Sequence, residues 1–299
     1  MTFIDLKFVI LFLFQTATGA LGNFSLLCHS IFLYFSGYRS RSTDVILRHL
    51  TVANTLVILS RGIPETMAAF GAEDFLSDAG CKLVFYVQAV GRGVSFSTTC
   101  LLSVFQAITI SPRSSGWAEV KLKALKYIWS CAIVSWVIHM LLNIRVPLLV
   151  NDKRNNKNIT DITDFQYCSA TSSDKDQNSI FAALTLSHNI LCLKLMIWSS
   201  GSMVFILLRH KQRTRHLHRH SSCRSSPETR ATQSILILVC AFVSFSTLSS
   251  IWYVWFILYR KAAWWLVKAH ALTSGCFPTT SPFILMTREH CACRPMWKT

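Results

Sequence analysis

The sequence predicts an all-α membrane protein, a bundle of seven transmembrane helices with the N-terminus outside the cell and the C-terminus in the cytoplasm. Composition is the first observation behind this prediction. Of the 299 residues, 52% are hydrophobic and 15% are charged, whereas a soluble domain carries about 25% charged residues. The second observation is that the charges gather in short stretches between long apolar runs. Together they exclude a disordered chain and a small disulfide scaffold, and they argue strongly against a soluble α/β enzyme.

Seven apolar segments are long enough to cross a membrane as helices, which takes about 20 residues. They lie at about 8–35, 45–70, 81–110, 127–150, 180–208, 231–258 and 265–287. Helices are expected because lipid offers the backbone no hydrogen-bond partners, and no segment alternates like a barrel strand. The first segment begins like a signal peptide, but its apolar run continues to Phe35, so we expect a retained span. The prediction is therefore one seven-transmembrane domain over residues 1–299.

The distribution of lysine and arginine sets the expected orientation. The loops after the first, third and fifth segments, together with the tail, carry sixteen of these residues, whereas the opposite side carries seven. The side richer in lysine and arginine is expected to be cytoplasmic. Because the net charge of +16 is accounted for by these loops, we do not expect a nucleic-acid partner.

Two features fall on the side expected to face outward. Asn158 begins a glycosylation sequon in the loop after the fourth segment. Cys81 and Cys168 are the cysteines outside both the spans and the cytoplasmic face, on the oxidising side of the membrane. We expect them to form a disulfide that pins this loop across the mouth of the bundle; the alternative is two free thiols.

Ionisable residues inside the spans are candidates for a ligand cavity, because burying a charge in lipid is costly. Glu65 lies near the outer end of the second segment and Arg92 lies in the third. Their opposite charges favour a pair, for which Arg61 competes. They either anchor a polar or anionic group of a ligand or lock the two helices together without touching a ligand.

Aromatic and histidine side chains in the outer halves of the spans form a second group of candidates. Its members are Tyr86, His188, Trp252 and Trp255. They could line an apolar pocket. The alternative is that they are belt residues at the membrane interface or core packing residues.

Several longer motifs follow one another in order along the chain. They are Gly22-Asn23, LTVAN (50–54), LSRGIPETMAAFG (59–71), VGRGVS (90–95), TTCLLSVFQAITISPR (98–113), NKNIT (156–160), SGSMVFILLRHKQR (200–213), SSPETRATQSIL (225–236) and CFPTTSPFILM (276–286). This series resembles the vomeronasal type-1 receptors, a mammalian family of G-protein-coupled pheromone receptors. The resemblance implies an outer binding site for a small-molecule chemosignal and coupling to an inhibitory-type heterotrimeric G protein inside.

Two residues depart from the pattern of the family that the chain resembles. Glu65 stands where a glutamine is usual, and Lys194 stands where a small residue is usual. A lysine well inside a span costs at least about 2.5–3.5 kcal/mol. Either Lys194 faces a polar cavity, or this copy of the receptor is impaired.

The inner side carries the residues expected to meet the G protein. They are Gln106, Arg113, Arg209, Lys211, Arg213 and Arg215. The alternative for the basic segment 209–230 is that it only anchors the topology or attracts anionic membrane lipid.

Two cysteines and a histidine run complete the inner side. Cys291 and Cys293 closely follow the last span and are palmitoylation candidates. The run His216–His220 with Cys223 does not have the spacing of a zinc site and is surrounded by arginines. We expect neither a metal nor a cofactor.

Two other functional classes are less well supported by the sequence. A transporter should show paired broken helices and an acidic relay at the midplane, whereas Glu65 is the spanning carboxylate and lies near one end. A membrane enzyme needs converging histidines and carboxylates. His49, His139, His188 and His270 are scattered and have no carboxylate at helical spacing. We therefore predict a receptor and not an enzyme.

Overall fold

The computed structural model describes residues 3–37, 42–72, 75–111, 115–151, 162–165, 167–171, 175–217, 233, 235–248 and 264–293. Helical residues fall in each of the seven predicted spans. The helices are α1 (Phe3–Phe35), α2 (Ser42–Ala69), α3 (Asp78–Ile110), α4 (Ser115–Leu142), α5 (Val146–Leu149), α6 (Lys175–Leu217), the segment Ile235–Leu248 and α8 (Trp264–Cys293). Within the described part of the chain, four helical stretches are apolar and long enough to cross a membrane: Lys7–Phe35, Asp78–Ile110, Glu119–Leu149 and Ala183–Arg209.

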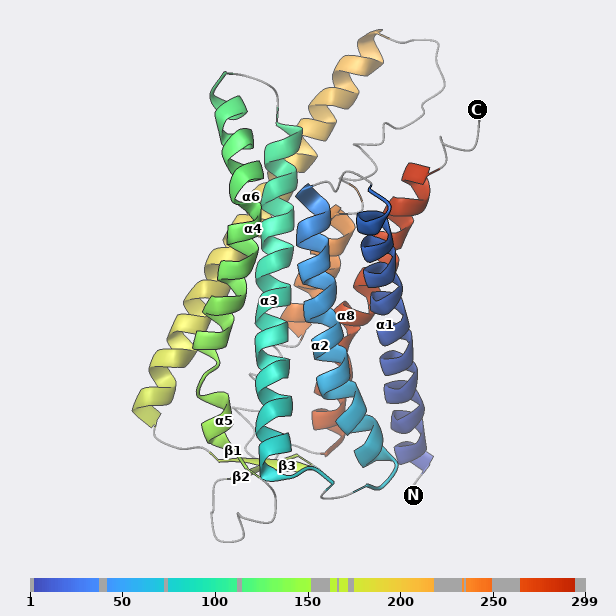
Figure 1. Ribbon diagram of the computed structural model, residues 1–299, viewed down its shortest axis with the longest axis vertical. Coiled ribbons are helices and arrows are strands. Elements are labelled where there is room, and N and C mark those ends of the chain that lie inside the picture. Colours follow the sequence, from blue (N-terminus) through green and yellow to red (C-terminus); the bar gives the residue numbers. More distant parts are fainter. Residues whose placement is uncertain are drawn as a thin grey trace.

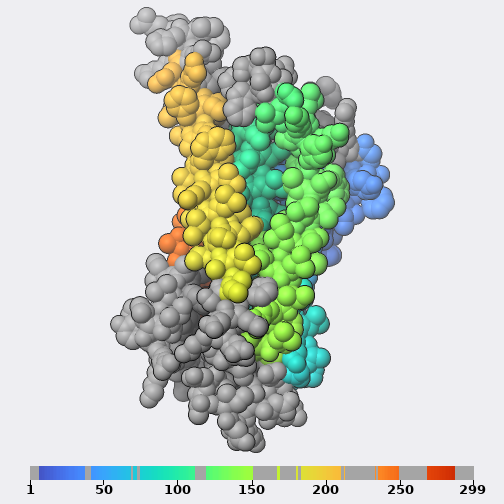
Figure 2. All heavy atoms as spheres, turned by 90° about the vertical axis from the view of Figure 1, so that its left-hand side faces the viewer, coloured from blue at the N-terminus to red at the C-terminus, as the bar shows by residue number. Residues whose placement is uncertain are grey.

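The long helices run roughly along one axis, with α3 in the middle of the bundle (Figure 1). α2 and α8 lie between α3 and α1, whereas α4 and α6 lie on the other side of α3. The start of α1 and the end of α8 lie at opposite ends of the bundle. Figure 2 shows that α4 and α6 form one outer face of the molecule, with α3 visible between them.

A three-stranded antiparallel sheet lies at the end of the bundle where α3 begins (Figure 1). It consists of β1 (Val150–Asn151), β2 (Ile162–Phe165) and β3 (Cys168–Thr171), in the order β1-β3-β2. These strands were not anticipated from the sequence. They lie in the loop between the fourth and fifth spans, where water can satisfy an open sheet edge, so the spans themselves remain helical.

The fourth helix differs most from its predicted bounds. It begins at Ser115 and ends at Leu142, rather than covering 127–150. Pro147 has no N–H to donate to the carbonyl of Asn143, so the α-helical pattern is interrupted there. A turn follows instead, in which the Val146 N–H donates to the Asn143 carbonyl over 3.0 Å.

Local signals define the loop between α2 and α3. Gly71 has a positive φ of 87°, which a glycine adopts without a steric penalty. The Gly71 N–H donates to the Ala68 carbonyl and the Ala72 N–H to that of Met67, the paired bonds of a Schellman motif. At the start of α3, the Ser77 hydroxyl accepts from the Gly80 N–H over 3.3 Å.

Glycines allow α1 to pack closely against its neighbours, as is common between membrane helices. A Cβ atom on Gly19 would lie 2.5 Å from Cδ1 of Ile58 on α2. A Cβ atom on Gly275 of α8 would lie 2.9 Å from the side chain of Gln15. Only glycine therefore fits at these two crossings without repacking.

Candidate functional site

Glu65 lies at the centre of a polar cluster in the half of α2 that is nearer the sheet. Its side chain is 7% exposed. The cations close enough to act on its carboxylate are Arg61, one turn earlier, and Lys268 of α8. Tyr167, just before β3, lies within hydrogen-bonding reach of the same carboxylate. The structure thus joins Glu65 to α8 and to the sheet.

The cations that act on Glu65 include Arg61, which the sequence offered as the competitor of Arg92. Arg92 projects from an exposed position on α3. Together with Arg61 it acts electrostatically on His270 of α8. The predicted pairing of Glu65 with Arg92 stays a prediction. We call Arg61, Glu65, Arg92, Lys268 and His270 the polar layer.

A small cavity adjoins the polar layer between α1, α2 and α8. It is lined by Phe12, Gln15, Thr16, Val57, Ile58, Arg61, Gly62, Ala271, Gly275 and Thr279. Its volume is about 20 Å³, room for about one water molecule. Among the described residues, Nε of Arg61 is buried without a hydrogen-bond partner. Arg61 is thus a polar group available to a bound molecule or water.

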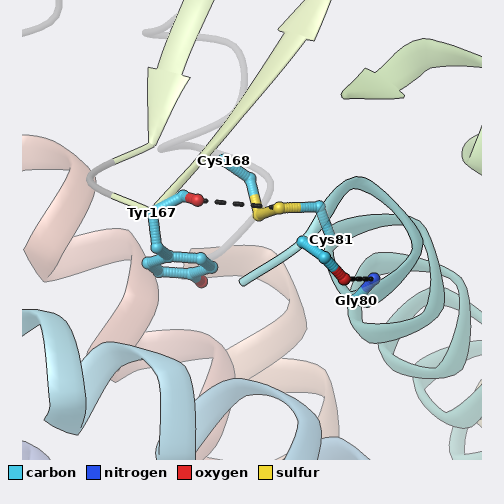
Figure 3. Close-up of a disulfide and its surroundings, with 5 residues drawn as sticks. Gly80, Cys81, Tyr167 and Cys168 are labelled. Atoms are coloured by element: carbon cyan, nitrogen blue, oxygen red, sulfur yellow. Dashed lines mark hydrogen bonds between the residues drawn. A yellow bond between two sulfur atoms is a disulfide. The ribbon is translucent and has the colours of Figure 1, made fainter. Parts of the chain in front are cut away.

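The Cys81–Cys168 disulfide ties the sheet to the start of α3, with the Tyr167 ring beside it (Figure 3), and Tyr167 reaches Glu65 of the polar layer. Cys81 of α3 and Cys168 of β3 are joined with an S–S distance of 2.02 Å. Tyr167 is 3% exposed and packs against the rings of Phe75 and Phe85. Burial, reinforced by the nearby Glu65 carboxylate, raises the pKa of the Tyr167 phenol. Tyr167 therefore remains a protonated donor.

Deeper in the bundle, His188 belongs to a polar network that joins α3, α4 and α6. Nε2 of His139 lies 2.8 Å from the Ser97 hydroxyl, and Nε2 of His188 lies 3.4 Å from it. The two imidazole rings meet edge to face at 4.9 Å. Within the described part of the chain, Nδ1 of His188 is buried without a partner, so it too is available to a ligand or water.

Tyr86 has a structural contact in this state. Its hydroxyl donates to the carbonyl of Met140 over 3.2 Å and so ties α3 to α4. Trp252 and Trp255, the other aromatic candidates, lie outside the described residues, as do Asn158 and Arg113.

A buried network at the middle of the bundle was not identified as a site from the sequence. The Asn54 amide donates to the Ser281 hydroxyl over 2.8 Å and accepts from the Ser95 hydroxyl over 2.7 Å. Asn54, Ser95 and Ser281 therefore join α2, α3 and α8. The available signals were an asparagine in the second span and a Ser-Pro pair in the last span. The sequence does not show that α2, α3 and α8 meet at these residues.

Asn23 compensates for a proline in α8. Pro282 has no N–H to donate to the carbonyl of Pro278, one turn earlier. The Asn23 amide of α1 donates to that carbonyl over 2.9 Å. This contact explains why a Gly-Asn pair in α1 accompanies prolines in α8.

The residues expected to contact a cytoplasmic partner lie in different environments. Gln106 is 6% exposed, so its side chain faces other helices and not the inner surface. Arg209 is exposed. Lys211, Arg213 and Arg215 lie on α6, which extends beyond the rest of the bundle (Figure 1). Cys291 and Cys293 belong to the last turn of α8 rather than following it.

Lys194 does not face a polar cavity. The buried residues of α6 are Cys192, Met196, Ser199 and Met203, which share one face of the helix. Lys194 is exposed and lies on roughly the opposite face. Exposed apolar side chains surround it, including Leu191 and Trp198. The structure therefore directs Lys194 toward lipid, because the inward positions of α6 are already taken.

These features define a multi-pass helical membrane protein with a polar layer under a disulfide-held sheet. Among the residues that the structure describes, no group of three or more His, Cys, Asp or Glu side chains is placed to hold a metal.

Comparisons with known proteins place this membrane protein in a family. Residues 6–298 match the vomeronasal organ pheromone receptor family. The chain is 54% identical to vomeronasal type-1 receptor 2 of Homo sapiens over 93% of its length and 70% of that protein. It is 52% identical to human vomeronasal type-1 receptor 4 over 91% of both chains. It is also 27% identical to olfactory receptor class A-like protein 1 of Danio rerio, over 92% of this chain and 87% of that protein. The chain belongs to the vomeronasal organ pheromone receptor family of membrane receptors and is not an enzyme.

Proposed function

We propose that this protein is a chemosensory receptor that binds a small-molecule chemosignal from outside and activates an inhibitory-type G protein in the cytoplasm. The proposal places the N-terminus outside, the C-terminus inside and one seven-transmembrane receptor domain over residues 1–299. The polar layer carries the proposal. It gathers ionisable groups from α2, α3 and α8.

The composition of the polar layer indicates the kind of ligand it would hold. Arg61, Arg92 and Lys268 contribute three positive charges, and Glu65 contributes one negative charge. An excess of cations suits a ligand with an anionic or strongly polar group. The buried nitrogen atoms of Arg61 and His188 without partners offer further polar contacts.

The sheet and its disulfide support the outward placement of this end. Disulfides persist on the oxidising side of the membrane. The sequon at Asn158 lies between β1 and β2, in the same loop. The basic extension of α6 lies at the other end, where positive charge is retained on the cytoplasmic side.

The proposal is tested by a G-protein activation assay in cells that express the full-length receptor. A panel of anionic, polar and apolar small molecules identifies an agonist, and Arg92→Gln is then compared with the unmodified receptor. A charged hydrogen bond is worth about 1.5–3 kcal/mol, so we expect potency to fall at least about tenfold. Lys82→Gln is the matched control, because Lys82 pairs with Asp78 outside the polar layer.

Surface expression is measured for both variants in the same cells. Loss of potency in Arg92→Gln, with normal surface delivery and an unaffected Lys82→Gln, supports a ligand site at the polar layer. Unchanged potency in Arg92→Gln excludes Arg92 from ligand binding. A receptor that moves ions or solute without activating a G protein contradicts the proposal as a whole.

One observation favours a second candidate function, an impaired copy of such a receptor. Lys194 faces lipid within the apolar stretch Ala183–Arg209. An ammonium group there opposes insertion unless its side chain reaches the interface. An impaired copy would reach the cell surface poorly and would respond to no member of the panel.

A further inference from the structure

A cluster of one arginine and several aromatic rings joins α1, α2 and α4 at the end of the bundle opposite the sheet. The Arg48 guanidinium lies 5.9 Å from the centre of the Tyr34 ring and 5.7 Å from that of Trp129. His49 meets Trp129 edge to face at 5.7 Å and accepts from Nε1 of Trp136 over 3.1 Å. We call these five residues the Arg48 cluster.

The Arg48 cluster is open toward the surroundings of the bundle. The Tyr34 side chain is 63% exposed and that of Trp129 is 51% exposed, whereas Arg48 is half-buried between them. Two rings therefore hold the guanidinium in a fixed orientation and leave part of it accessible.

Position along the helices places Tyr34 and Arg48 near the end of the bundle, whereas Trp136 lies deeper, against Ala53 and Val94. Tyr34 lies in the last turn of α1. Arg48 lies six residues after the start of α2 at Ser42, which corresponds to about 9 Å along the axis. Tyrosine, tryptophan and arginine are the side chains that suit the boundary between headgroups and acyl chains.

The charges around the cluster are predominantly positive. Lys126 lies one turn before Trp129 on the same side of α4 and is exposed. Asp44, one turn before Arg48, is the acid on this part of α2. Among the residues that the structure describes, no carboxylate lies within ion-pair distance of the Arg48 guanidinium, whose contacts are aromatic.

We infer that the Arg48 cluster is a binding site for an anionic phospholipid of the cytoplasmic leaflet. Arg48 holds a headgroup phosphate with its planar fork of N–H donors. Lys126 adds a second positive charge, and the acyl chains lie along the exposed apolar surface that includes Val52 and Ile133. The assignment to the cytoplasmic leaflet rests on the proposed orientation of the chain.

Charge distinguishes this occupant from a neutral lipid. A sterol could stack on Trp129, but its single hydroxyl would leave the guanidinium without a counter-charge. A phosphatidylcholine headgroup brings its own ammonium, which opposes Arg48. An anionic headgroup satisfies Arg48 and Lys126 together, and a basic pocket between membrane helices is a known form of such a site.

Native mass spectrometry of the purified full-length receptor tests the inference. Phosphatidylinositol 4,5-bisphosphate and phosphatidylserine are the anionic probes, and phosphatidylcholine and cholesterol are the neutral ones. We expect the unmodified receptor to retain the anionic lipids preferentially. Arg48→Gln should weaken their apparent affinity about fivefold. Lys123→Gln is the matched control, because it removes one charge near the same leaflet from a residue paired with Glu119.

Each outcome decides the inference. A selective loss in Arg48→Gln supports the site, whereas an equal loss in Lys123→Gln shows only diffuse electrostatic attraction and overturns it. Equal or stronger retention of phosphatidylcholine or cholesterol by the unmodified receptor also overturns it. If Arg48→Gln does not fold, Trp129→Leu replaces it, since that ring is exposed and supports Arg48. An N-terminal epitope on intact cells tests orientation independently, so failure of the topology is distinguishable from failure of the lipid site.

Discussion

Gly93→Ala should destabilise the bundle, because His139 of α4 packs directly on the Gly93 backbone of α3. A Cβ atom at position 93 would overlap the His139 ring, with Cγ at 2.6 Å and Cε1 at 2.7 Å. The ring is 2% exposed. It lies 2.8 Å from the Ser97 hydroxyl and meets the His188 ring edge to face, so these contacts oppose its displacement.

The magnitude follows from these contacts. Forcing an extra methyl group into a packed core costs about 1–3 kcal/mol. Displacing the imidazole also removes its bond to Ser97, which is worth about 0.6–1.7 kcal/mol between membrane helices. We therefore expect Gly93→Ala to lower the free energy of unfolding by about 2–5 kcal/mol.

Thermal unfolding of the purified receptor, followed by circular dichroism, measures this effect. Gly201→Ala is the matched control, because a Cβ atom on Gly201 would have no heavy atom within 4 Å. A double-mutant cycle with His139→Ala tests the cause, since removing the ring should relieve the clash and restore part of the stability. The reasoning is refuted if Gly93→Ala unfolds at the same temperature as Gly201→Ala. It is also refuted if adding His139→Ala to Gly93→Ala restores no stability.

Two further predictions concern delivery to the cell surface. Cys168→Ser should reduce surface expression and signalling, because the disulfide joins residues separated by 87 positions and holds the sheet over the polar layer. Chain entropy for a loop of this length limits the stability lost with the disulfide to about 4–5 kcal/mol. Flow cytometry of receptor at the cell surface measures the loss of delivery. Surface expression equal to that of the unmodified receptor would contradict the role of the disulfide. Lys194→Leu should increase surface expression, because it removes a lipid-facing cation that costs about 2.5–3.5 kcal/mol at the centre of a span. An unchanged surface fraction would show that Lys194 reaches the interface at no cost.

The hydrogen bonds of Asn54 and Asn23 tie α1, α2 and α3 to α8. Both converge on α8, where Pro278 and Pro282 lie. A helix that lacks backbone donors at two positions bends more readily than an uninterrupted one. We expect ligand-dependent movement of the bundle to involve this part of α8, because α8 also contributes Lys268 and His270 to the polar layer.

The positions of the spans were readable from the sequence because they depend on a local property. Crossing lipid requires about 20 apolar residues in an unbroken stretch, whatever the rest of the chain does. The bounds were less accurate, since α6 and α8 continue past both predicted limits, whereas α4 begins earlier and ends earlier than predicted. Helices continue into water wherever hydrogen bonding and side-chain packing allow. The hydrophobicity of the sequence therefore does not predict the residue at which a helix ends.

The sequence by itself determined that the chain is a helical membrane protein with a cysteine pair at one end. It also showed which ionisable residues lie within the spans. The tertiary structure alone decided that Lys268 of α8 and Tyr167 beside the sheet lie near Glu65, and that Lys194 lies on an exposed face of α6. The physical reason is that partners depend on how each helix is rotated and placed against its neighbours. That rotation results from packing among all the helices, and no single segment encodes it.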